Sequence, residues 1–79
     1  MLPVIRGKDL VAFFETPGFL VIRQKGSHVR MKSDDGRNTT VPVHSGETIP
    51  EGLLRKIIRE DLEMTPGDFV QAYEKYKGH

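Results

Sequence analysis

Near the start of the chain, apolar and polar residues follow the period of an amphipathic helix. Between Lys8 and Glu15 the spacing predicts a helix of two turns with one buried stripe, formed by Leu10, Val11, Phe13 and Phe14. The helix should end at the Thr16-Pro17-Gly18 segment, because a residue before proline avoids helical backbone angles and glycine favours a turn.

The pattern then changes to the one that is typical of strands. Phe19 to Gln24 is rich in aromatic and β-branched residues, and Gly26 separates it from a second strand, Ser27 to Ser33. The Asp34-Asp35-Gly36 segment predicts a hairpin turn of three residues with glycine in the left-handed region. A third strand follows from Asn38 to Val43.

Alternation decides which side chains share a face of the sheet. In the second strand Val29 and Met31 should point to the core, and in the third strand Val41 and Val43 should do the same. The side chains that this leaves on the outer face are His28, Arg30, Lys32, Thr40, Pro42 and His44.

The length of the hairpin turn sets the register of the second and third strands. A three-residue turn pairs Ser33 with Arg37, so His28 lies opposite Pro42 with His44 on the diagonal. A five-residue turn would place His28 directly opposite His44 instead. Both registers put the two histidines on one outer surface. Because Pro42 cannot donate a hydrogen bond to a neighbouring strand, the third strand should be an edge.

The strongest helical pattern lies beyond Gly46. Five residues mark its apolar face: Leu53, Leu54, Ile57, Ile58 and Leu62. Two starts are open, because Thr48 and Glu51 form a capping box while Pro50 favours the first turn. Thr65 should cap a last short helix, whose expected packing residues are Phe69, Val70, Tyr73 and Tyr76.

The order of elements is therefore helix, three antiparallel strands, helix and a short C-terminal helix, which is an α+β protein. The 79 residues make one domain near the lower size limit for a self-sufficient core. We expect residues 1–62 to form that core and residues 65–77 to form a helical extension.

Composition removes several classes of site. The chain has no cysteine, which excludes disulfides and thiolate metal sites, and its three histidines lack metal-ligand spacing. We therefore expect no metal and no other cofactor. The apolar runs are too short for a membrane span, and no signal-peptide pattern precedes the first helix. The expected location is the cytoplasm, without membrane contact.

Charge is unevenly distributed, although the net charge is only +1. Residues 1–32 carry six basic and two acidic residues, a net of +4, whereas residues 33–79 carry six basic and nine acidic ones, a net of −3. The asymmetry favours a basic binding face on a nearly neutral body, although a scatter of solvated charges is an alternative.

The most basic segment also holds a titratable group, in the run Arg23-Gln24-Lys25-Gly26-Ser27-His28. RNA can be cut without metal by its own 2′-hydroxyl, provided that a base takes the proton and cations stabilise the phosphorane. His28 is the natural base, because imidazole exchanges a proton near pH 7. The candidates for charge stabilisation are Lys25, Arg30 and Arg23, and Gly26 permits close approach of the backbone to a phosphate.

Each of these roles has a plainer alternative. His28 is equally compatible with an exposed strand histidine that has no role. His44 is either a general acid or phosphate contact, or a polar residue that ends an edge strand. Ser27 could be a nucleophile only if a base lay beside it, so a role in strand entry or in backbone contact is favoured.

At these spacings the chain resembles the HicA toxins of bacterial toxin–antitoxin modules. The resemblance lies in Gly18-Phe19, in the Arg23 to His28 run, in Val41-Pro42-Val43-His44 and in the helix around Leu54 to Ile58. It covers residues 7–62. It implies a fold similar to a double-stranded-RNA-binding domain, α-β-β-β-α, with a three-stranded antiparallel sheet and two helices on one face.

The resemblance also implies an activity and partners. The activity is ribosome-independent cleavage of mRNA, with His28 as the catalytic residue and a HicB-type antitoxin that covers its surface. The free toxin should be monomeric and should join a hetero-oligomer with the antitoxin. The expected RNA-binding residues are Arg23, Lys25, Gly26, Ser27, Arg30, Lys32 and His44. The alternatives are a non-catalytic module that binds double-stranded RNA, and a protein that binds only an acidic protein partner.

Overall fold

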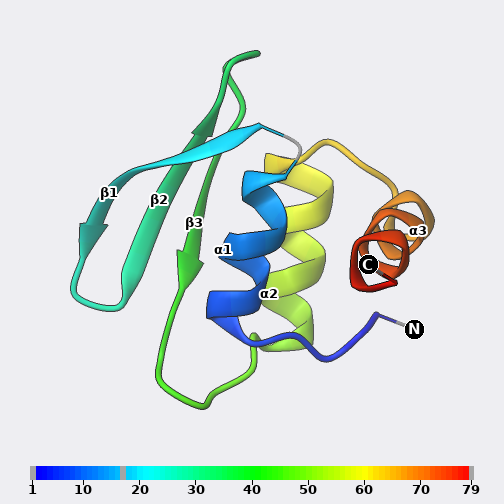
Figure 1. Ribbon diagram of the computed structural model, residues 1–79, viewed down its shortest axis with the longest axis horizontal. Coiled ribbons are helices and arrows are strands. Elements are labelled where there is room, and N and C mark those ends of the chain that lie inside the picture. Colours follow the sequence, from blue (N-terminus) through cyan, green and yellow to red (C-terminus); the bar gives the residue numbers. More distant parts are fainter. Residues whose placement is uncertain (1, 17, 79) are drawn as a thin grey trace.

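The computed structural model describes residues 2–16 and 18–78 and has an α+β architecture (Figure 1). Its elements in chain order are α1 (Gly7–Glu15), β1 (Phe19–Lys25), β2 (His28–Ser33), β3 (Asn38–Pro42), α2 (Glu51–Lys56), the π-helical turn η1 (Ile57–Asp61) that continues α2, and α3 (Pro66–Lys77). This confirms the expected helix, three strands, helix and added C-terminal helix. Pro17, expected in the turn after α1, lies outside the described residues.

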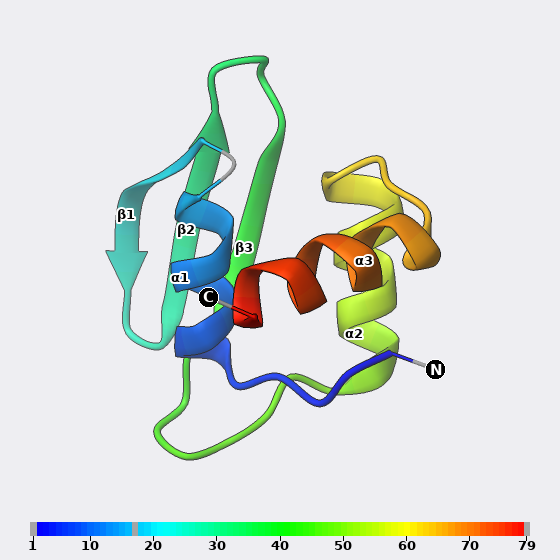
Figure 2. The ribbon, with the colours of Figure 1, turned by 45° about the vertical axis from the view of Figure 1, so that its right-hand side comes forward.

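The elements form three layers. The antiparallel sheet has the order β1-β2-β3, α1 and α2 lie side by side against one of its faces, and α3 packs on the far side of these helices (Figure 1 and Figure 2). No described element covers the other face of the sheet. None of the helices in the described part of the chain has both the length and the hydropathy of a membrane-spanning segment.

The core lies between the sheet and the helices α1 and α2, and α3 closes it. Leu10, Met31 and Ile58 are fully buried there. The ring of Phe69 in α3 meets the ring of Phe13 in α1 edge to face, with centroids 5.7 Å apart. The phenylalanines expected in the core are all buried: Phe13, Phe14, Phe19 and Phe69. This packing covers one side of the sheet and leaves its other side to solvent.

The central hairpin has the register of the three-residue turn. His28 lies opposite Pro42, and the Ser33 N–H donates to the carbonyl oxygen of Arg37 at 2.9 Å. Gly36 has φ of 95°, the left-handed conformation expected at the end of this turn. The structure therefore excludes the five-residue turn, and it confirms β3 as an edge strand.

The pairing of β1 with β2 contains a β-bulge that the strand pattern did not predict. Val21 pairs with Met31, but Arg23 pairs with the next residue of β2, Arg30, so Ile22 is an extra residue in β1. A bulge of this kind shifts every following side chain to the opposite face of the strand. The strand also runs to Lys25, one residue further than predicted.

Of the two starts that the sequence left open for the second helix, the structure excludes the capping box at Thr48 and places the start beside Pro50. Thr48 instead forms an isolated antiparallel bridge with Arg6, and the Ile49 N–H donates to the Ile5 carbonyl at 2.8 Å. The N-terminal segment thus holds this stretch extended, and the helix begins at Glu51, one residue after Pro50. The cap predicted for the last helix is confirmed, since the Asp68 N–H donates to the hydroxyl oxygen of Thr65 at 3.1 Å.

Candidate active site and RNA interface

The open side of the sheet carries five basic side chains, which we call the basic face: Arg23, Lys25, His28, Arg30 and Lys32. In β2 these exposed residues alternate with buried Val29 and Met31. In β1 the two cations join them because residues opposite each other share a face: Arg23 lies opposite Arg30, and Lys25 lies opposite His28. Within the three described strands, no outward position holds Asp or Glu.

The bulge at Ile22 is what brings the two strands' cations together. Phe19 is buried on the helix-covered side and Val21 follows it on that side, so regular alternation would have sent Arg23 and Lys25 there too. The extra residue reverses the alternation and turns both cations onto the open face. The sequence contained a signal for this. A two-residue turn places Lys25 beside outward His28, which conflicts with inward Phe19 unless one residue is inserted.

His28 occupies the first position of β2, at one corner of the basic face. It lies opposite Lys25 of β1 and Pro42 of β3, and its side chain is exposed. Just before it, Gly26 has φ of 58°, so the chain reverses through a left-handed residue with open space around it. A substrate phosphate can therefore reach both the imidazole and the cations that flank it.

The end of β3 brings His44 to the same corner. The Val43 N–H donates to the carbonyl oxygen of Ser27 at 2.6 Å, and the Ser27 Oγ lies 3.3 Å from the His44 Nε2. This contact joins the turn before His28 to the segment that follows β3. If the serine O–H donates to Nε2, the neutral His44 carries its ring proton on Nδ1; when the ring is protonated, Nε2–H donates to the serine oxygen and Nδ1–H is left to serve as an acid. The serine and histidine contact was not predicted from the sequence.

Comparison with known proteins identifies the chain. The family model for the HicA toxin of bacterial toxin–antitoxin systems matches residues 7–62, which is more than half of the chain. The chain belongs to the HicA toxin family. The matched segment begins with α1 and ends directly after η1, so α3 lies outside it. No curated protein matches the chain. Membership of a toxin–antitoxin family implies an antitoxin partner.

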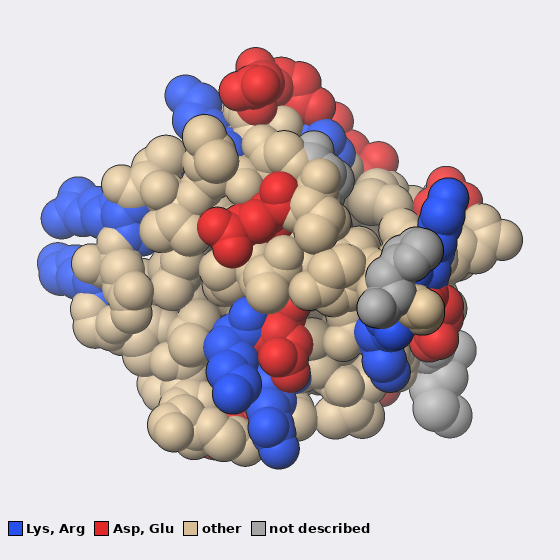
Figure 3. Space-filling view, viewed as in Figure 1, with Lys and Arg blue, Asp and Glu red and all other residues tan. Residues whose placement is uncertain are grey.

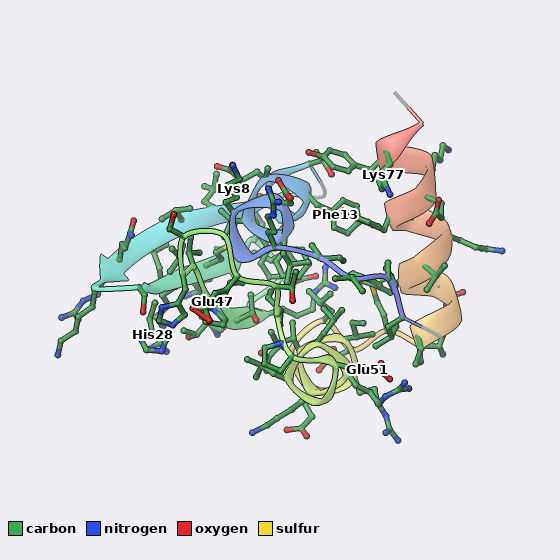
Figure 4. The ribbon with its side chains drawn as sticks, turned by 90° about the horizontal axis from the view of Figure 1, so that it is seen from below. Lys8, Phe13, His28, Glu47, Glu51 and Lys77 are labelled. Carbon is green, nitrogen blue, oxygen red and sulfur yellow. The ribbon has the colours of Figure 1, made fainter. Side chains whose placement is uncertain are left out.

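In this HicA family member, a polar hollow of about 300 Å³ adjoins His44, and Arg6 and Lys8 line it together with the 43–46 loop. Neither cation was expected at the site from the sequence. Gly7 brings them there: a Cβ at Gly7 would lie 2.1 Å from the Pro42 carbonyl oxygen, so only glycine lets α1 start against the end of β3. Figure 4 shows this end of the molecule, with Lys8, His28 and Glu47 labelled.

The acidic residues of the central hairpin lie at the opposite end of the sheet. There the Arg37 Nε donates to both carboxylate oxygens of Asp35, at 3.0 and 2.9 Å, and another Arg37 nitrogen donates to the Leu62 carbonyl. Hydrogen bonds from the Arg37 side chain and backbone lower the pKa of Asp35 to about 2. The hairpin thus keeps its acidic turn away from His28 and pairs its carboxylate locally.

The remaining candidates do not join the site. Arg55, Lys56 and Arg59 lie on the α2–η1 helix, where Arg55 pairs with Glu51 at 3.1 Å across one turn, as on an ordinary solvated helix face. Across residues 2–16 and 18–78 there is no cluster of three or more His, Asp or Glu side chains that could hold a metal ion.

Proposed function

We propose that this HicA family member is an endoribonuclease that cleaves mRNA without a metal ion, with His28 as the general base. The observation that carries the proposal is the position of His28: an exposed imidazole at the corner of a cationic, acid-free sheet face. Such a face attracts the phosphates of a nucleic acid, and the imidazole lies where a bound phosphate would be held.

The reaction that fits these groups is an internal transesterification. His28 takes the proton of a ribose 2′-hydroxyl, the 2′-oxygen attacks the adjacent phosphorus, and the bond to the 5′-oxygen breaks. The products are a 2′,3′-cyclic phosphate and a 5′-hydroxyl, whose proton comes from a general acid. His44 is our candidate for that acid because it lies at the same corner and is oriented by Ser27. Positioned acids and bases each contribute about 10²- to 10⁴-fold.

Cations on the basic face would stabilise the extra negative charge of the phosphorane. Lys25 lies directly opposite His28, and Arg30 is the next outward residue of β2. Arg23, opposite Arg30, and Lys32 extend the face along the sheet. We assign these four to phosphate binding, with Gly26 and Ser27 offering backbone groups at the turn. Cations positioned in advance stabilise a transition state without reorganising, which is why their placement by the bulge matters.

The antitoxin of this family member would hold the toxin inactive by covering the His28 surface in a hetero-oligomer. The free, monomeric toxin would then degrade mRNA and stop translation. Expression of the chain alone should arrest growth and deplete mRNA, and His28→Ala should abolish both effects while the protein stays folded. Lys77→Ala, on the distant end of α3, is the matched control and should remain toxic. If His28→Ala is as toxic as the unmodified chain, the proposal is wrong.

A second candidate is a non-catalytic module that binds double-stranded RNA. The α-β-β-β-α arrangement favours it, because that arrangement resembles domains that recognise duplex RNA by shape and phosphate contacts. It predicts RNA binding that weakens with salt, no cleavage products, and affinity that does not change in His28→Ala. Incubation of the purified chain with duplex and single-stranded RNA separates the two candidates.

A further inference from the structure

The free edge of β1 is apolar and exposed, unlike the other strand edge of the sheet. Leu20, Val21 and Ile22 are 62%, 44% and 53% exposed, although residues of this kind are usually buried. β1 pairs only with β2, so the backbone groups on its outer side have no strand partner among the described residues. In Figure 1 and Figure 2, β1 projects beyond the helices that cover the rest of the sheet.

Such an edge is a template for another strand. Proteins normally guard an exposed edge with prolines, short strands or charges, as Pro42 does in β3. In β1 the charges come only after the apolar segment, at Arg23 and Lys25. An added strand would gain backbone hydrogen bonds along β1 and would cover its apolar side chains.

The charges of the edge decide which strand fits. If a second copy of this chain paired along the same edge, the two sheets would merge into one. Their basic faces would then lie next to each other and repel. Figure 3 shows basic side chains projecting at the left margin, where β1 lies in Figure 1, with no acidic side chain beside them on that face. An occupant with apolar residues opposite Leu20–Ile22 and carboxylates opposite Arg23 and Lys25 satisfies both halves of the strand.

We propose that the β1 edge binds an extended segment of the antitoxin by strand addition, with an apolar half and an acidic half. Naming the antitoxin as the partner rests on the proposed function; the chemistry of the segment does not. The added strand would lie beside the basic face, so its carboxylates would form ion pairs with Arg23 and Lys25, the cations that we assign to RNA binding. Attachment and inhibition would then use neighbouring residues of a single strand.

Two synthetic peptides with blocked ends test the proposal on the full chain. Each peptide has an apolar half of valine and isoleucine and a second half of alternating threonine and glutamate. The apolar half comes first in one peptide and last in the other, so the two distinguish parallel from antiparallel pairing with β1. We expect one of them to bind and to protect outward β1 amides from hydrogen exchange. The same peptide with alternate backbone nitrogens methylated should lose the binding, because it cannot pair as a strand.

Variants of the chain complete the test. The double variant Leu20→Thr and Val21→Thr should weaken peptide binding by about tenfold. Val4→Thr, at an exposed valine outside the sheet, is the matched control and should bind normally. The double variant should retain RNA cleavage, because it leaves the basic face in place. If the unmodified chain binds the peptide but does not cleave RNA, only the proposed function is refuted.

Three results would overturn strand addition by an acidic segment. They are the absence of binding by either peptide, equal binding of the methylated peptide, and equal binding of peptides with lysine in place of glutamate. Sedimentation of the free chain supplies a fourth, because a dimer that Leu20→Thr and Val21→Thr dissociates would assign the edge to a second copy.

Discussion

The two ends of the sheet differ in whether their charged side chains form ion pairs. At the turn after β2, Arg37 pairs with Asp35, and that pairing lowers the pKa of the carboxyl group to about 2. At the turn before β2, the cations around His28 form no salt bridge with any residue in the described ranges. Charge that is paired locally stabilises a turn, whereas unpaired charge on an open face is available to a ligand. The difference supports our proposal that RNA binds at the His28 end.

The largest effect should come from reversing the two β1 charges that the bulge places on the basic face. The double variant Arg23→Glu and Lys25→Glu replaces two cations, opposite Arg30 and His28, by two groups that repel phosphate. We expect RNA affinity to fall roughly ten- to a hundredfold at about 0.1 M salt, as removal of two phosphate contacts predicts. Fluorescence anisotropy with a labelled RNA measures it. The double variant Arg55→Glu and Lys56→Glu on the helix is the control, and equal losses in both would refute the role of the basic face.

Neutralising the same two β1 charges should produce a smaller loss of RNA affinity. In the double variant Arg23→Gln and Lys25→Gln, the slope of log affinity against log salt for single-stranded RNA should shrink by about 1.4. A matched double variant on the helix, Arg55→Gln and Lys56→Gln, should leave the slope nearly unchanged. A slope that responds equally to both pairs would mean that RNA does not distinguish the sheet face from the helix.

A smaller effect is expected at the His44 corner. His44→Ala removes the candidate acid and should slow cleavage by about 10²-fold or less, with RNA affinity nearly retained. Ser27→Ala removes only the group that orients His44 and should slow cleavage by roughly threefold. Single-turnover rates across pH measure both, and the His44 variant should lose the alkaline limb of the profile. An unchanged profile would make His44 structural.

The smallest effect on cleavage should come from the acidic turn. Asp35→Asn should leave the rate unchanged but lower stability near neutral pH, because it removes the ion pair with Arg37. The folded pKa of about 2 lies below the ordinary 3.8, so this stabilisation is complete above the ordinary value and is lost as pH falls through about 2. Urea unfolding of both forms should therefore converge in strong acid. If the difference in unfolding free energy between the two forms were the same at every pH, the stabilising role of the Asp35–Arg37 ion pair would be contradicted.

Much of the fold follows from local pattern. The alternation in β2 and the glycine turn after it determine the register, so the outward position of His28 could be predicted. The bulge was missed because Phe19 to Ile22 are all apolar, so their alternation carries no signal; only the parity of the two-residue turn reveals the bulge. The sequence could not choose between the helix starts at Thr48 and Pro50, because the choice depends on a distant segment, around Ile5, that holds the backbone at Thr48 extended.

The site was predictable only in part, for a similar reason. Residues of one strand, such as His28 and Arg30, can be grouped by period. The contact between Ser27 and His44, and the arrival of Lys8 beside it, depend on how α1 docks at the end of β3. That docking relies on close approach at Gly7, which no periodic pattern reveals.

The most direct test of a metal-free nuclease is the chemistry of the RNA ends. The purified chain is incubated with a single-stranded RNA of defined sequence in excess chelator, and the fragments are analysed by mass spectrometry. We expect cleavage at a rate that the chelator does not change, with 2′,3′-cyclic phosphate and 5′-hydroxyl ends. Intact RNA, or 3′-hydroxyl ends that disappear with the chelator, would contradict the assignment of His28 as a base acting on the 2′-hydroxyl.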